Sequence, residues 1–256
     1  MSAELRQVSP RKEAVRVMFD DLAPEYVEER ERQPSFLAQQ RIVLDMLSGL
    51  RGRLLEVGCG PATMFEHFLA RGFDEVHGID VSPEMIRQAE SRIAHHPLAD
   101  QCALRVADIE HLPYADGTFD VVVAMGVLEY LSGYGAALAE IRRVLRRGGH
   151  VILTVPNRTS AYHLARSSYL NMRRLLGRPR GTAMAVHPCI PWSLNRQLAA
   201  AGMDKVRSSA CNFIFFPLKE VSERVSSAVS SRLAPLSRTP LAPLLGAQYI
   251  VKAVRR

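Results

Sequence analysis

The sequence predicts an α/β protein built on a doubly wound, mostly parallel sheet of seven strands. Two observations carry this prediction. Short apolar runs alternate with amphipathic segments between residues 53 and 155, which indicates βαβ units with right-handed crossovers. The first apolar run, Arg53–Val57, ends in Gly58-x-Gly60 and is followed by a helical pattern. Glycine at such a turn lets a ligand approach the backbone beside the free N–H groups of the next helix.

Length and composition favour one globular domain. The chain has 256 residues, 47% of them hydrophobic, and we expect residues 1–256 to form a single domain with a sizeable core. Its apolar runs are shorter than the roughly 20 residues of a membrane-spanning helix, and its polar N-terminus is unlike a secretory signal. The four cysteines are scattered, which indicates reduced thiols in a cytoplasmic protein. The histidines lack ligand spacing, so we expect no metal site.

The net charge is +7 at pH 7. A basic surface is typical of proteins that meet nucleic acid, anionic lipid or an acidic substrate, but it also serves solubility alone. The charge therefore leaves the partner open.

The first 50 residues are expected to form a helical cap. Apolar residues at helical spacing predict a helix over residues 12–22, which Pro24 should interrupt, and a second helix over residues 36–50.

Residues 51–157 should form the ligand-binding core. Gly72 suits the end of a helix over residues 63–70, and Ser82-Pro83-Glu84 is a favourable start for the next. A third helix should stop at Gly148-Gly149. The five strands that we expect are Arg53–Val57, residues 75–79, residues 103–107, Phe119–Met125 and residues 150–155.

The rest of the chain departs from this alternation. Residues 158–190 mix arginines with large apolar side chains, and we expect a lid inserted after the fifth strand. Residues 191–256 should complete the sheet and the pocket for a second ligand. The elements expected there are a helix over 191–202, extended segments at 206–209 and 212–216, an amphipathic helix over 218–233 and a last strand over 248–254.

Polar residues follow the predicted strands at one edge of the sheet. Asp80 and Asp108 stand just after the second and third strands, and the Gly58 turn stands just after the first. Because ligands bind at the carboxyl ends of parallel strands, this edge should bind a nucleotide-like molecule. A dinucleotide site would have a third glycine at Thr63, so the pattern counts against NAD.

The motif Glu56-x-Gly58-x-Gly60 resembles the first motif of class I S-adenosylmethionine-dependent methyltransferases, which have a Rossmann-like fold. Further segments are similar to that family at residues 78–85, 107–113, 116–120 and 144–149. Residues 19–26 resemble the N-terminal segment of the small-molecule, ubiquinone-biosynthesis-like branch. Ala62 stands where the family has a further glycine, and Glu129-Tyr130 stands where it often has histidine.

The resemblance implies binding of S-adenosylmethionine, with S-adenosylhomocysteine as the product. Asp80 would accept hydrogen bonds from the ribose, Asp108 would meet the adenine, and Tyr26 the methionyl carboxylate. Glu56 and Asp108 could instead cap backbone amides, and Tyr26 could pack under the lid. The full set of expected cofactor-binding residues is Tyr26, Glu56, Gly58, Cys59, Gly60, Asp80, Val81, Met85, Asp108, Ile109, Met125 and Gly126.

The methyl acceptor is expected to be small and hydrophobic or anionic, and methylated most readily at oxygen. His187 and Glu129 are the candidate general bases, although His187 could bond only to backbone and Glu129 could anchor a turn. N- or C-methylation, and a cofactor-binding scaffold or RNA-associated module without turnover, remain alternatives. The motifs of base methylation are absent after the fourth strand, so nucleic acid is disfavoured as a substrate. The basic lid could also contact a membrane.

Overall fold

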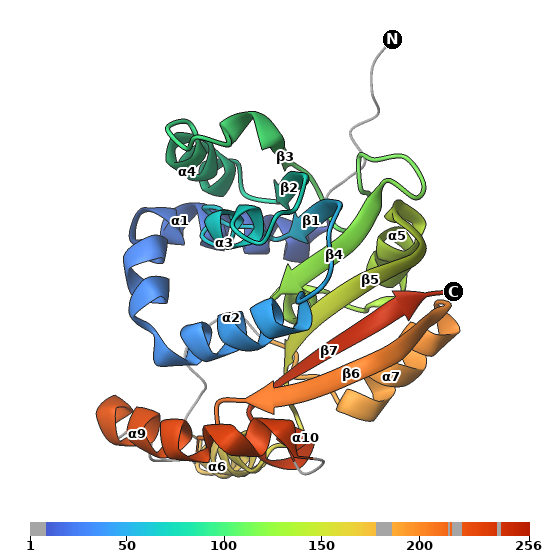
Figure 1. Ribbon diagram of the computed structural model, residues 1–256. Coiled ribbons are helices and arrows are strands. Elements are labelled where there is room, and N and C mark those ends of the chain that lie inside the picture. Colours follow the sequence, from blue (N-terminus) through green and yellow to red (C-terminus); the bar gives the residue numbers. More distant parts are fainter. Residues whose placement is uncertain (1–8, 178–185, 215, 217–221, 240–241) are drawn as a thin grey trace.

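The structure is a computed structural model that describes residues 9–177, 186–214, 216, 222–239 and 242–256. Within these residues the chain forms the predicted α/β fold, with a seven-stranded sheet in the order β3-β2-β1-β4-β5-β7-β6 (Figure 1). β7 runs antiparallel to both of its neighbours, and the pairs from β3 to β5 are parallel. The strands are β1 (Arg53–Val57), β2 (Glu75–Asp80), β3 (Cys102–Val106), β4 (Phe119–Met125), β5 (Leu145–Pro156), β6 (Met203–Cys211) and β7 (Gln248–Arg255).

Helices cover both faces of the sheet, and each face has its own apolar core. On one face, side chains such as Val43, Phe65 and Ile86 pack from α2 (Pro34–Met46), α3 (Phe65–Leu69) and α4 (Pro83–Ile93). On the other face, Ile141 and Leu198 pack from α5 (Gly135–Val144) and α7 (Pro191–Ala200). Ser82 begins α4 as predicted, because its hydroxyl accepts a hydrogen bond from the Met85 amide.

The prediction that Pro24 interrupts the first helix was wrong. α1 runs from Pro10 to Arg32 with Pro24 inside it, and its ribbon changes direction part-way along (Figure 1). Proline removes one backbone hydrogen bond and usually bends a helix. Both halves of α1 are held by other parts of the chain: Asp20 bonds to Ser82 at 2.6 Å, and the Tyr26 ring lies against the Gly60 turn. These contacts keep both halves helical.

The predicted end of the helix before β5 was also wrong. α5 ends at Val144, and Leu145 pairs with Phe119 as the first residue of β5. Because Phe119 pairs with Leu145 and Val121 with His150, the register shifts here to accommodate the additional residues of β5. Gly148, within this irregular stretch, has a φ of +74°. Gly148-Gly149 therefore lies inside an irregular strand.

The C-terminal third contains the predicted elements with different limits. Asn212 has a φ of +59°, so the chain turns at the end of β6, and residues 212–214 do not form the start of the extended segment expected over residues 212–216. The parts of the predicted lid and amphipathic helix at residues 178–185 and 217–221 lie outside the described residues. The remaining elements are α6 (Ala161–Leu175), α9 (Glu223–Leu233), α10 (Ala242–Leu245), and short 3-10 turns η1 (Ala99–Gln101), η2 (Leu128–Tyr130) and η3 (Ala234–Arg238). In the described part of the chain, no helix is long and apolar enough to cross a membrane.

Candidate functional site

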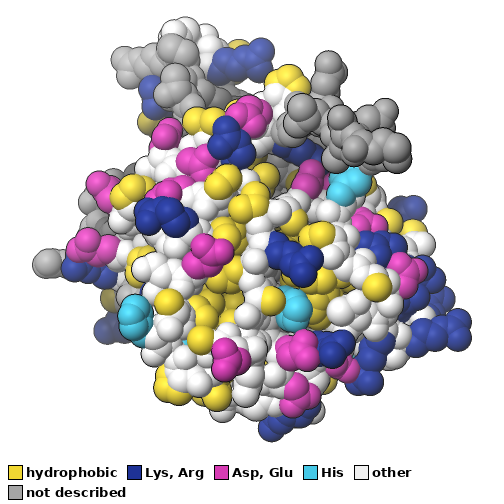
Figure 2. Space-filling view, turned by 90° about the horizontal axis from the view of Figure 1, so that it is seen from above, with side chains coloured by type: hydrophobic (Ala, Val, Ile, Leu, Met, Phe, Trp, Pro, Cys, Tyr) yellow, Lys and Arg dark blue, Asp and Glu magenta, His cyan; other side chains and the backbone are white. Residues whose placement is uncertain are grey.

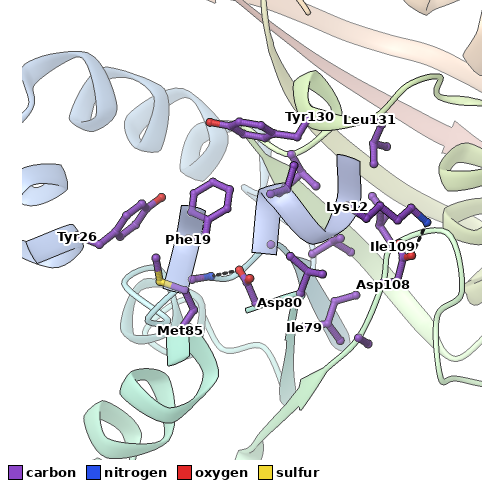
Figure 3. A pocket seen from close by; sticks show the side chains of 17 residues that line it. Lys12, Phe19, Tyr26, Ile79, Asp80, Met85, Asp108, Ile109, Tyr130 and Leu131 are labelled. Carbon is purple, nitrogen blue, oxygen red and sulfur yellow. Dashed lines mark hydrogen bonds and ion pairs between the residues drawn. The ribbon is translucent and has the colours of Figure 1, made fainter. Parts of the chain in front are cut away.

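A cavity of about 90 Å³ lies at the carboxyl ends of β1 and β2, and α1 closes it from outside (Figure 3). Seen from above, apolar side chains occupy the hollow in the middle of this face, surrounded by side chains of both charge signs (Figure 2). The lining residues are Lys12, Val15, Phe19, Tyr26, Val57, Gly58, Gly60, Ile79, Asp80, Val81, Met85, Ala107, Asp108, Ile109, Val127, Tyr130 and Leu131.

The glycine turn after β1 forms one wall of this main cavity. Gly58 has a φ of +67°, and a Cβ atom there would lie 2.4 Å from Cγ2 of Val127. Gly60 has a φ of +51° and faces Tyr26, whose Cε1 would lie 3.5 Å from an added Cβ. Gly58 must therefore be glycine, because its positive φ and the nearby Val127 side chain both exclude a Cβ atom. At Gly60 the absence of a side chain lets the backbone lie against the Tyr26 ring. Ala62 also takes a left-handed φ of +57°, where the related motif has glycine.

Asp80 ends β2 and holds the glycine turn in place. Its two carboxylate oxygens accept hydrogen bonds from the amides of Gly60 and Ser82, each at 2.9 Å. Burial raises the pKa of Asp80, and these hydrogen bonds oppose the rise. A carboxylate so placed still has lone pairs facing the cavity for a ligand's hydroxyl groups.

Glu56, on β1, is a buried carboxyl group with an unsatisfied oxygen. Its side chain is 3% exposed, and among the described residues Oε2 has no hydrogen-bond partner. Burial raises its pKa well above the ordinary value, and the nearby charge of Asp80 adds to the rise. A buried polar atom without a partner calls for an explanation, and a cationic ligand group is one.

Asp108 lies two residues beyond the end of β3 and is engaged by α1. Its Oδ1 accepts the Glu110 amide at 2.9 Å, and its Oδ2 pairs with Lys12, which also pairs with Glu110. Burial lowers the pKa of Lys12, but the hydrogen bonds and charges of the two carboxylates outweigh it and leave the pKa raised. Lys12 therefore stays protonated, and it pairs with Asp108, the carboxylate that we expected from the sequence to bind the adenine.

Aromatic side chains from α1 and η2 enclose the other end of the cavity. The Phe19 ring packs edge-on against Tyr26 and Tyr130, with ring centroids 6.4 Å and 5.3 Å away. The Arg30 guanidinium lies over the Tyr26 ring, 5.1 Å from its centroid. Desolvation by these neighbours raises the pKa of Tyr26.

The two candidate bases meet after β4. Glu129 is 7% exposed, and its Oε1 would lie 3.4 Å from a Cβ at Gly126, where the backbone turns with a φ of +67°. Burial raises the pKa of Glu129 to about 7, and its Oε2 has no partner within the described part of the chain. The His187 amide donates to the Glu129 carbonyl at 3.0 Å, while the His187 side chain is exposed.

The structure brings most of the predicted cofactor residues together. Eight of them line the main cavity, and four do not: Glu56, Cys59, Met125 and Gly126. The Cys59 side chain packs toward Gly78 in the core, so its own contribution to the cavity would come from backbone. The individual roles given to these residues stay predictions.

Sequence reasoning missed Lys12, Val127 and Leu131, which also line the cavity. Lys12, Val15 and Phe19 follow one another at helical spacing, so the apolar pattern of α1 carried the signal. From the sequence we expected a helix there but no ligand contact, and the break expected at Pro24 separated that helix from Tyr26.

Comparison with known proteins supports the family resemblance that the sequence motifs indicate. Residues 55–153 match a family described as a methyltransferase domain. A malonyl-[acyl-carrier protein] O-methyltransferase of Salmonella typhimurium is 34% identical over 56% of this chain and 53% of its own. A ubiquinone/menaquinone biosynthesis C-methyltransferase of Geotalea daltonii is 28% identical over 67% of this chain and 76% of its own. Magnesium protoporphyrin IX methyltransferase from Synechocystis, solved with bound S-adenosylhomocysteine, has the same fold, with a TM-score of 0.66 at 17% identity over 96% of this chain and 100% of its own.

Residues 55–153 form a methyltransferase domain of the class I S-adenosylmethionine-dependent kind. Apart from residues 19–26 in α1, the motifs that suggested this family fall where its domain matches, between β1 and β5. Other curated relatives, 32–38% identical, match this methyltransferase chain over only 38–41% of their own length. The shared part is the nucleotide-binding half of the sheet, and the segments after β5 lie beyond the matched domain.

Proposed function

We propose that this methyltransferase transfers a methyl group from S-adenosylmethionine to a small metabolite, most readily at an oxygen atom. The observation that carries the proposal is the convergence of Asp80, Asp108 and the Gly58 turn on one cavity at the sheet edge. A relative named as a ubiquinone/menaquinone biosynthesis C-methyltransferase supports a small acceptor, and one named as a malonyl-[acyl-carrier protein] O-methyltransferase supports transfer to oxygen.

The residues at the cavity fit this cofactor. S-adenosylmethionine carries an ammonium group, a ribose diol and an adenine amino group, which need acceptors. Asp80 would take the ribose, and Asp108 with the Ile109 amide would take the adenine. Glu56 does not line the cavity in this form, and its unsatisfied Oε2 would meet the ammonium group when the site opens. Tyr26 would donate to the methionyl carboxylate. The cavity of about 90 Å³ is smaller than the roughly 300 Å³ or more of typical small-molecule sites, and we infer that α1 shifts outward when the cofactor binds.

For this reaction the protein has to align the reactants, exclude water and remove one proton. When bound, the cofactor supplies a methyl group already activated on a sulfonium. Phe19, Tyr26 and Tyr130 exclude water from the enclosed end of the cavity. As the methyl group moves to the acceptor oxygen, Glu129 would take the hydroxyl proton on its unpartnered Oε2. A base with a pKa of about 7 suits this transfer at neutral pH.

His187 is the second proposed base. Its exposed side chain follows the lid segment, and its backbone is tied to Glu129. A base on this loop would act on the acceptor from the solvent side, whereas Glu129 would act from within.

The four cysteines are unpaired, which supports a reducing, cytoplasmic setting.

Calorimetry with S-adenosylmethionine and S-adenosylhomocysteine tests the proposal. We expect both to bind, and Asp80→Asn to weaken binding about ten- to a hundredfold, because each charge-assisted hydrogen bond contributes roughly 1.5–3 kcal/mol. Asp100→Asn, at an exposed acid of η1, is the matched control. Unchanged affinity in Asp80→Asn would remove Asp80 from the ribose site.

A labelled-methyl screen then separates the reaction classes. We expect label in phenols or carboxylates, whereas label in amines or on ring carbon would move the reaction to N- or C-methylation. Binding without transfer to any acceptor class, together with retention of RNA in moderate salt, would favour the scaffold alternative.

A further inference from the structure

α6 carries a stripe of large apolar side chains that face solvent. The exposed fractions are 56% for Leu164, 51% for Met172 and 87% for Leu175, and Leu176 just beyond the helix is 68% exposed. Successive members of this stripe are eight, three and one residues apart, which places all four on one side of a helix with 3.6 residues per turn. A soluble protein does not gather such residues on one helix without a partner surface.

The rest of the fold holds α6 by a few contacts. Tyr162 is the buried residue of this helix, and the Tyr169 ring packs against Phe216 at a centroid distance of 5.0 Å. The contacts therefore lie along one edge of the helix. The Leu and Met stripe stays exposed against the described part of the chain.

The charged side chains of α6 have one sign. Arg166 and Arg174 are exposed on α6, Arg173 is half-buried, and the α6 sequence contains no acidic residue. The face seen in Figure 2, in contrast, interleaves both signs. Arginine beside an exposed apolar stripe is the pattern of helices that lie in the interface of an anionic bilayer.

The neighbouring helices extend this surface. α10 packs against α6, and α6, α9 and α10 all lie at the bottom of the view in Figure 1. Leu244 of α10 is 54% exposed and Val225 of α9 is 49% exposed. We call this the α6 surface, and it consists of Leu164, Met172, Leu175, Leu176, Leu244 and Val225 with Arg166 and Arg174.

We propose that the α6 surface docks the protein on a membrane that contains anionic phospholipid. The apolar stripe enters the headgroup boundary while the arginines contact lipid phosphates. Docking would bring the segments that follow β5, where this chain leaves the shared methyltransferase domain, against the bilayer. The proposal stands apart from methyl transfer, since vesicle binding is measured without cofactor or acceptor.

Co-sedimentation with vesicles tests this proposal. The full chain is mixed with vesicles of phosphatidylcholine alone or with a third of phosphatidylglycerol, at low and high salt. We expect binding to the anionic vesicles that is about tenfold tighter than to neutral ones and that weakens with salt. Met172→Asn/Leu175→Asn should lose about tenfold in binding, since it removes two inserted side chains.

Two further variants complete the test. Arg166→Gln/Arg174→Gln should lower binding to anionic vesicles and leave the weak binding to neutral vesicles unchanged. Leu98→Asn/Val206→Asn, at exposed apolar positions 37% and 56% accessible outside the α6 surface, is the control and should bind as the wild type. Equal binding by all three variants would overturn the proposal. So would self-association of the wild type, measured by light scattering, that disappears in Met172→Asn/Leu175→Asn.

Discussion

Replacing Glu129 by Gln should change how the stability of the protein depends on pH. Burial raises the pKa of Glu129 from an ordinary 4.5 to about 7, so the folded state holds this proton more tightly than the unfolded chain. A group of this kind contributes nothing unfavourable below its unfolded pKa, and it destabilises the folded state increasingly as pH rises toward its folded pKa. Gln keeps the shape of the side chain and cannot ionise.

The size of the effect follows from the two pKa values. One pKa unit corresponds to about 1.4 kcal/mol, so ionisation of buried Glu129 costs the folded state about 3 kcal/mol above pH 7. The wild type should therefore lose about 3 kcal/mol of unfolding free energy relative to Glu129→Gln between pH 4.5 and pH 8. Glu56 titrates in the same sense in both proteins and cancels in the difference.

Urea unfolding at pH 5, 6, 7 and 8 measures this difference directly. Glu66→Gln, at an exposed carboxyl on α3, is the matched control and should track the wild type at every pH. If the unfolding free energies of wild type and Glu129→Gln change in parallel with pH, the pKa of Glu129 is not raised. Glu129 would then not be a base suited to neutral pH.

Three other substitutions test the site. Lys12→Met should tighten S-adenosylmethionine binding by up to about tenfold in calorimetry, because it frees the carboxylates that α1 now engages; weaker binding would mean that Lys12 itself holds the cofactor. Gly58→Ala should lower the unfolding free energy by about 2–4 kcal/mol, since it combines a left-handed φ with a clash against Val127, whereas Gly133→Ala, with open space around it, should cost little. His187→Ala should lower kcat and spare cofactor affinity, and wild-type turnover would remove His187 from the mechanism.

The cofactor half of the fold could be predicted because local signals and topology agree there. β1 and β4 occupy the predicted residues, since each is an apolar run bounded by turn glycines such as Gly52 and Gly117. The positions of Asp80 and Asp108 at the cavity followed from the rule that parallel strands bring their carboxyl ends to one edge. Neither step required knowledge of side-chain packing.

The errors arose where tertiary contacts overrule a local signal. Gly148-Gly149 has the composition of a helix stop, but pairing of Leu145 with Phe119 draws the preceding residues into β5. Pro24 has the composition of a helix break, but contacts on both sides of it preserve α1. In neither case does the sequence within a few residues contain the partner that decides the outcome.

The same long-range contacts explain how α1 can close the site without locking it. Lys12 binds the loop after β3, Asp20 binds the start of α4 after β2, and Arg11 donates to a carbonyl of η2 after β4 at 2.7 Å. The helix therefore ties together the three loops that surround the cavity. Each tie is polar and partly exposed. The Lys12–Asp108 ion pair typically contributes about 0–1 kcal/mol, and each of the two hydrogen bonds to a charged group roughly 1.5–3 kcal/mol. Opening the helix breaks these ties and leaves the sheet intact, so cofactor entry and closure of α1 can be one coupled equilibrium.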